Sequence, residues 1–192
     1  MKRVIPLGIV LAAFSMLTAP ASAGTLTATG VMSATPDGAD WDYTIKLTNT
    51  SGPGGDNIGT FWFSWIPGQG YLPSLPTSIT APTGWKEKIT DGPPPGDGYS
   101  IQFVANSSSV LTPGSSLLFG FVSADSPSTL AGLSTIHPPT PIGTSTLYQG
   151  GPFVGDSKEF VVTSVPEPST LTLGIVGLAS LAALRLRRKS AV

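Results

Sequence analysis

Apolar and polar residues alternate in several short stretches of the chain, as expected for strands with one buried and one solvated face. The stretches expected to form strands are residues 41–48, 60–66, 78–80, 85–90, 99–105, 116–123 and 160–163. Segments rich in glycine, proline and asparagine separate them at 49–59 and 91–98. Residues 126–155 carry many prolines and few clear strands. This pattern predicts an all-β fold, an antiparallel β-sandwich of immunoglobulin-like or jelly-roll type.

The same alternation divides the aromatic residues between the two faces of the expected sheets. The aromatic residues assigned to the core are Trp41, Phe61, Phe63, Trp65 and Phe103. Trp62 falls on the opposite face of its strand, and Trp85 follows a Pro-Thr-Gly turn. An exposed tryptophan offers a flat apolar surface on which a sugar ring can stack, so Trp62 and Trp85 are candidate sugar platforms. The alternative is that Trp62 fills space under a long loop, because tryptophans are usually largely buried.

The N-terminal residues have the three parts of a secretory signal peptide. A basic start, Met1-Lys2-Arg3, precedes an apolar run over 4–17 and small residues that include Ala21 and Ala23. We therefore expect signal peptidase to remove residues 1–23 by cutting between Ala23 and Gly24, which leaves residues 24–164 as one exported domain. The chain contains no cysteine, so an ordinary hydrophobic core must stabilise that domain without disulfides.

The C-terminal residues combine an uncharged stretch with a basic tail. As a helix, residues 171–184 would reach roughly 21 Å, against a hydrocarbon core of roughly 30 Å. We expect a marginal transmembrane helix at about 170–184, which makes a single-pass inner-membrane form. The basic residues after it, Arg185, Arg187, Arg188 and Lys189, would stay in the cytoplasm and keep the domain outside. The helix could be a permanent anchor or a transient one that holds a processing site near the membrane; an amphipathic helix is disfavoured because apolar residues surround it.

The residues before that helix are expected to form a rigid extended segment, Val165-Pro166-Glu167-Pro168-Ser169. Proline restricts its own backbone conformation and disfavours a helical conformation in the residue before it. A Pro-Glu-Pro motif, a short apolar helix and an arginine-rich tail, in this order, resemble the PEP-CTERM sorting signal of envelope proteins in certain Gram-negative bacteria. The resemblance covers residues 165–192. It implies recognition of Pro166, Glu167 and Pro168 by exosortase, a membrane-embedded cysteine protease or transpeptidase, with the basic tail as stop signal.

The chemistry-bearing residues between the two ends are few. Residues 24–164 hold four lysines and ten acidic residues, a net charge of −6 that disfavours nucleic acid as a partner. His137 is the one histidine, in a proline-locked loop, and no Gly-x-Ser-x-Gly nucleophile motif accompanies it. Asp40 and Asp42 would share one side of a strand, a spacing that suits calcium or a glycosidase pair but is more typical of solvated positions. We therefore expect no enzymatic activity, no catalytic residue, no metal site and no cofactor.

Together these patterns favour an exported structural or interaction protein of the cell envelope or exopolysaccharide matrix. Its expected partners are signal peptidase, an exosortase-like enzyme, the inner membrane and an exopolysaccharide. The Pro-Gly turn and apolar strand over 111–121 are loosely similar to β-sandwich modules of cell-surface and carbohydrate-associated proteins. The alternative function is therefore that of a cell-surface carbohydrate-binding module.

Overall fold

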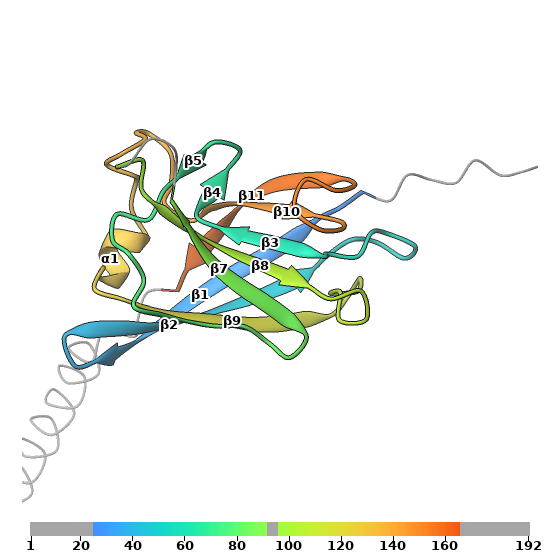
Figure 1. Ribbon diagram of the computed structural model, residues 1–192, viewed down its shortest axis with the longest axis horizontal. Coiled ribbons are helices and arrows are strands. Elements are labelled where there is room, and N and C mark those ends of the chain that lie inside the picture. The colour runs from blue at the N-terminus through green and yellow to red at the C-terminus, as the bar shows by residue number, and fades with distance from the viewer. Residues whose placement is uncertain (1–24, 92–95, 166–192) are drawn as a thin grey trace, which may run out of the picture.

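The computed structural model describes residues 25–91 and 96–165, which form an all-β domain (Figure 1). The strands in the described residues are β1 (Ala28–Asp37), β2 (Asp40–Asn49), β3 (Thr60–Phe63), β4 (Trp65–Ile66), β5 (Gln69–Gly70), β6 (Ser78–Thr80), β7 (Trp85–Asp91), β8 (Tyr99–Ala105), β9 (Ser116–Ser123), β10 (Thr144–Tyr148) and β11 (Ser157–Ser164). One short helix, α1 (Pro127–Leu130), follows β9. No helix within 25–91 or 96–165 is long and apolar enough to cross a membrane.

Nine of these strands form one hydrogen-bonded sheet that folds over into two facing layers. Their order is β6-β9-β2-β1-β11-β10-β3-β8-β7, while β4 and β5 form a separate hairpin. The fold-over occurs at β11, because its first half pairs antiparallel with β10 and its last residues pair parallel with β1. The expected layered all-β architecture is therefore present, but the layers are joined through a parallel pair rather than being wholly antiparallel.

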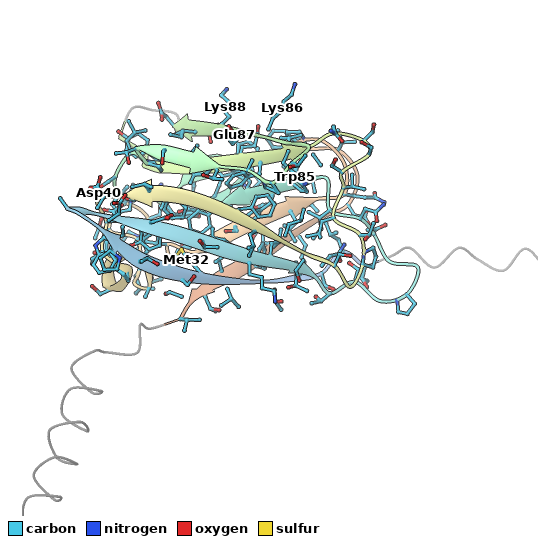
Figure 2. All side chains as sticks on the ribbon, turned by 90° about the horizontal axis from the view of Figure 1, so that it is seen from below. Met32, Asp40, Trp85, Lys86, Glu87 and Lys88 are labelled. Carbon is cyan, nitrogen blue, oxygen red and sulfur yellow. The ribbon has the colours of Figure 1, made fainter. Side chains whose placement is uncertain are left out.

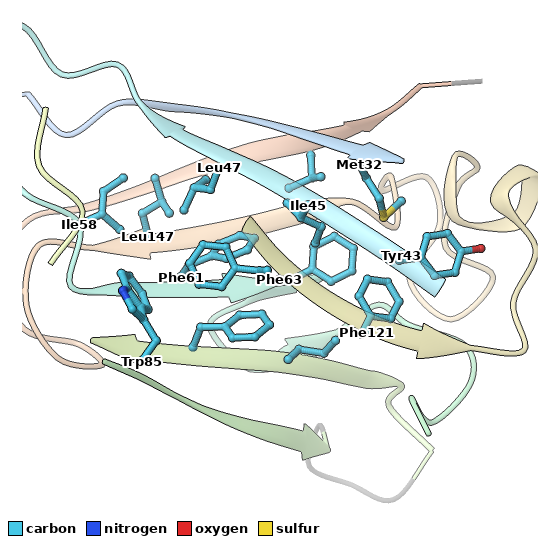
Figure 3. Close-up of a cluster of buried hydrophobic side chains, with 14 of the residues drawn as sticks. Met32, Tyr43, Ile45, Leu47, Ile58, Phe61, Phe63, Trp85, Phe121 and Leu147 are labelled. Carbon is cyan, nitrogen blue, oxygen red and sulfur yellow. The ribbon is translucent and has the colours of Figure 1, made fainter. Parts of the chain in front are cut away.

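The core lies between the two layers and is rich in aromatic side chains (Figure 3). Tyr43 of β2 stacks on Phe121 of β9 in one layer, with ring centroids 4.8 Å apart. Phe61 of β3 packs across the core against Phe119 of β9, with centroids 5.2 Å apart. Since the predicted core positions Phe61, Phe63 and Phe103 are fully buried, the alternation assigned these three correctly.

The strand predicted over 60–66 ends early, and this moves Trp65 to the other side of the sheet. Ser64 adopts a left-handed backbone with φ of 56°, which breaks the alternation after Phe63. Its hydroxyl donates to the carbonyl of Ile142 at 2.8 Å, and its N–H donates to Ser145 Oγ at 3.1 Å. The assignment of Trp65 to the main core is therefore wrong: it packs outside the sandwich, on Trp62.

Three strands appear where the sequence pattern predicts none, among them the two-residue strand β5. β1 lies before the first predicted strand, and β10 lies within the proline-rich stretch 126–155. β7 is one of the two edge strands of the nine-stranded sheet, and Figure 2 shows its Lys86 and Lys88 projecting into solvent. Charged side chains on an edge strand discourage pairing with another chain.

Candidate functional site

Trp62 lies on the outer face of β3, as the alternation predicts, but it is buried. Its side chain is 6% exposed, and its indole N–H lies 3.1 Å from the hydroxyls of both Thr90 and Ser100. Trp65 stacks on it with centroids 3.6 Å apart and the planes 9° from parallel. Because Trp65 occupies the face that a sugar ring would need, Trp62 does not serve as an exposed platform.

Trp85, the other predicted platform, belongs to the main core. It is also 6% exposed, and its ring meets Phe119 edge-on at 5.1 Å. Its indole N–H donates to the carbonyl of Ser109 at 2.9 Å. Both candidate platforms are therefore buried, and the alternative expectation, that Trp62 fills space beneath a loop, describes it correctly.

The loop that covers Trp62 and Trp65 places one phenylalanine at the surface. Phe153 is 64% exposed, has a φ of 64°, and meets both indoles edge-on at 5.7 and 5.8 Å. Tyr148 joins this aromatic cluster from β10, where burial and the nearby Glu159 carboxylate raise the pKa of its phenol. Phe153 is therefore the exposed ring of this aromatic cluster.

A different tryptophan borders a cavity of the described domain. Trp41 lies on the core-facing side of β2, but it is near the end of that strand and is only partly buried. The cavity beside it has a volume of about 390 Å³ and is lined by Trp41, Ser126, Pro127, Ser128, Ala131, Ser164 and Val165. We call it the Trp41 pocket; it occupies the end of the sandwich, between β2, α1 and the end of β11. The prediction that Trp41 fits the core is confirmed in part: it packs against the core cluster but is only partly buried.

The Trp41 pocket combines an indole with hydroxyl groups that are already ordered. Ser126 Oγ lies 2.8 Å from Ser128 Oγ and accepts from the N–H of Thr129 at 3.2 Å. Ser126 Oγ also lies 2.9 Å from Thr129 Oγ1, so its three hydrogen-bonding positions are filled. Ser128, for which Ser126 is the one hydroxyl partner among the described residues, keeps capacity for a bound ligand. The seven residues that line the pocket carry no ionisable side chain, so its chemistry suits a neutral ligand.

His137 lies in the loop between α1 and β10 and pairs with a carboxylate. Its Nε2 is 2.5 Å from Asp97 Oδ1, and its ring meets Tyr71 edge-on at 5.4 Å. Burial, followed by the Glu159 and Asp97 charges, raises the pKa of Tyr71. The nearby Ser134 hydroxyl accepts from the backbone N–H of His137 at 3.0 Å, so it is held by the loop backbone. This arrangement ties the loop of His137 to the segment before β8.

The two aspartates singled out in the sequence lie at the start of β2. Asp40 is partly exposed and Asp42 is exposed. No group of three or more His, Cys, Asp or Glu side chains in the described part of the chain is arranged to hold a metal ion.

The last strand leads directly into the predicted sorting segment. β11 ends at Ser164, and the N–H of Val165 still donates to the carbonyl of Met32 in β1 at 2.8 Å. No linker therefore separates the sheet from the Pro-Glu-Pro residues. The predicted signal peptide with its Ala23–Gly24 cleavage site lies outside the described residues. So do Pro166, Glu167, Pro168, the expected transmembrane helix at 170–184 and the basic tail.

Comparisons with known proteins agree with the assignment of the C-terminal end. The family model of the PEP-CTERM protein-sorting motif matches residues 164–189, and no curated protein matches the chain. Among solved structures, a biomass-sensing module of an Rsgi2 protein from Clostridium thermocellum, described as resembling a family 3 carbohydrate-binding module of the cellulosome, is 12% identical. It aligns over 72% of this chain and 95% of its own length with a TM-score of 0.30, which is too low to relate the two folds.

A PEP-CTERM motif implies an exported protein that is first membrane-associated and later placed in the cell envelope, with an exosortase-like enzyme as its processing partner. Residues 164–189 of this chain, which begin at the last residue of β11, match the PEP-CTERM protein-sorting motif.

Proposed function

We propose that this chain is a structural or interaction protein of the cell envelope or exopolysaccharide matrix, delivered by its C-terminal sorting segment. Signal peptidase would release residues 1–23, the helix at about 170–184 would hold the precursor in the inner membrane, and an exosortase-like enzyme would then act near Pro166–Pro168. The observation that carries this proposal is the match to the sorting motif at 164–189, which begins where β11 ends.

The proposed role of the β-domain is binding without turnover. Ser134, the serine beside His137, has its hydroxyl engaged by backbone amides, and the imidazole is paired with Asp97. A serine nucleophile would instead need its hydroxyl hydrogen-bonded to the imidazole. His137 therefore fits a structural role better than a catalytic one.

The intact mass of the protein from its native cells tests the sorting proposal. We expect a mature chain that starts at Gly24 and stops near Pro166–Pro168, with any excess mass on that end reporting a joined group. Replacing Pro166 and Pro168 together by alanine should leave a membrane-bound precursor, whereas Pro53→Ala, in an exposed loop, should be processed normally. A mature mass that runs from Gly24 to Val192 would contradict the proposal.

The second candidate function is carbohydrate binding at the cell surface. The observation that favours it is the Trp41 pocket, in which a partly exposed indole lies beside serine hydroxyls and no charged side chain. Retention on affinity gels that contain soluble polysaccharides tests this candidate.

A further inference from the structure

We propose that the Trp41 pocket binds one end or one short stretch of a neutral pyranose polysaccharide, with Trp41 as the stacking surface. The proposal deepens the second candidate function and rests on it. The candidate residue for stacking on a sugar is thus Trp41, which borders a cavity, instead of Trp62 and Trp85, which are both buried.

The size of the pocket limits the occupant. Its volume of about 390 Å³ lies at the lower end of small-molecule sites, roughly 300–1000 Å³. Such a site takes a few rings rather than a long buried chain. The pocket is partly open, so the rest of a polymer could continue into solvent.

The lining of the pocket selects the chemistry of the occupant. A sugar ring has an apolar C–H face that packs on an indole and hydroxyls around its rim that exchange hydrogen bonds with serines. The hydroxyls of Ser126 and Ser128 already bond to each other, and Ser126 also bonds to Thr129. Ser128 and Ser164 are therefore the serines with capacity to bond to the hydroxyls of a sugar. Trp41, Ser128 and Ser164 approach from β2, α1 and β11, so they would contact different sides of a bound ring.

Charge argues for a neutral polysaccharide over an acidic one. None of the described residues that line the pocket is ionisable, so they offer no counter-charge to a uronate or sulfate group that loses water there. The exported domain also carries a net charge of −6, which repels polyanions. Neutral hexose polymers therefore fit both the pocket and the domain around it.

The test measures binding of cellohexaose, laminarihexaose and mannohexaose to the full chain in mild detergent, with polygalacturonate as the acidic comparison. We expect at least one neutral hexaose to bind with a dissociation constant below about 10 mM and to change tryptophan fluorescence. Trp41→Ala should weaken that binding at least about tenfold. Phe153→Ala, which removes an exposed aromatic ring remote from the pocket, should leave it unchanged.

A second variant guards against misfolding of Trp41→Ala. Ala131 is exposed and lines the pocket, so Ala131→Phe should fill the cavity and abolish binding while the thermal midpoint stays near that of the parent. Absence of binding by all three neutral hexaoses, equal binding by Trp41→Ala, or preference for polygalacturonate would overturn the proposal. The mature mass is measured separately, on protein from the native cells, so a failed sugar site remains distinguishable from a failed sorting assignment.

Discussion

At the scale of single residues, Ser64 decides on which side of the sheet an aromatic side chain lies. Its left-handed φ of 56° turns Trp65 away from the core and onto Trp62. A left-handed backbone raises the conformational free energy of a residue that has a Cβ, and the two hydrogen bonds of Ser64 to Ile142 and Ser145 offset that cost.

This balance predicts an order of stabilities for substitutions at Ser64. Ser64→Ala keeps the backbone strain and leaves the buried Ile142 carbonyl without its donor, so it should lower the free energy of unfolding by about 1–3 kcal/mol. Ser64→Gly loses the same hydroxyl but relaxes the left-handed backbone, so it should cost about 1 kcal/mol less than the alanine variant. Urea unfolding of the three proteins checks the order; a glycine variant no more stable than the alanine variant would contradict it.

The two tryptophans Trp85 and Trp41 should respond very differently to truncation. Trp85 is 6% exposed, packs on Phe119 and donates to Ser109, so Trp85→Ala should cost about 3–5 kcal/mol. Trp41 is only partly buried at the border of a cavity, so Trp41→Ala should cost at most about 2 kcal/mol. Chemical denaturation measures both, and equal losses would mean that Trp41 is a core residue after all.

At the scale of elements, the strands that periodicity finds are those whose buried face is made of large apolar residues. β2 and β8 alternate cleanly and appear where predicted. β1 does not, because its two fully buried strand positions are Gly30 and Met32, and a glycine gives no hydrophobic signal. β10 is missed for another reason: it is buried on both faces, and Ser145 and Thr146 meet this burial by hydrogen-bonding to Gly143 and Trp65.

The candidate site residues also show what apolar–polar alternation can and cannot predict. Alternation places Trp62 on the outer face of β3 correctly, but it contains no information about Trp65 and the Phe153 loop that cover it. It also places Trp41 on the core-facing side correctly, without revealing that the core ends before it. Periodicity therefore assigns a face to a residue, whereas exposure depends on segments distant in the sequence.

The parallel joint between β1 and β11 depends on the small size of Gly30. A Cβ there would lie 2.8 Å from Val162 Cγ2 and 3.0 Å from Phe160 Cε2. Gly30→Ala should therefore push the two strands apart and cost about 1–3 kcal/mol. Gly52→Ala is the matched control, because nothing lies within 4 Å of its Cβ position, and it should change stability by less than about 0.5 kcal/mol. Equal effects of the two substitutions on the thermal midpoint would contradict this account.

At the scale of the whole molecule, two buried phenols make stability sensitive to alkaline pH. Burial and the Glu159 charge raise the pKa of Tyr148, and burial, Glu159 and Asp97 raise that of Tyr71. A raised pKa means that the folded state holds the proton more tightly than the unfolded chain does. The resulting stabilisation is therefore complete below about pH 10, the ordinary tyrosine pKa, and is lost as the pH rises through the higher folded values.

We therefore expect the urea midpoint of the parent protein to fall above about pH 10. The double variant Tyr71→Phe/Tyr148→Phe should fall less steeply over the same range, because it lacks both ionisable phenols while its lysines still titrate. Parallel pH profiles for the two proteins would show that these phenols do not contribute.

The whole-molecule arrangement also affects how the sorting enzyme gains access to its motif. β11 pairs with β1 as far as Ser164, and Val165 still donates to Met32. A protease groove usually takes residues on both sides of its recognition motif in extended form, so the enzyme competes with the sheet for the residues before Pro166.

A flexible Gly/Ser insert between Val165 and Pro166 would remove this competition and move the motif away from the domain. We expect the insert to speed conversion of precursor to mature protein in a pulse-chase experiment, while the same insert between Gly52 and Pro53, in an exposed loop, leaves the rate unchanged. An unchanged conversion rate with the first insert would mean that the enzyme engages only residues from Pro166 onward. A slower conversion would mean that the enzyme uses the folded end of β11 as part of its docking surface.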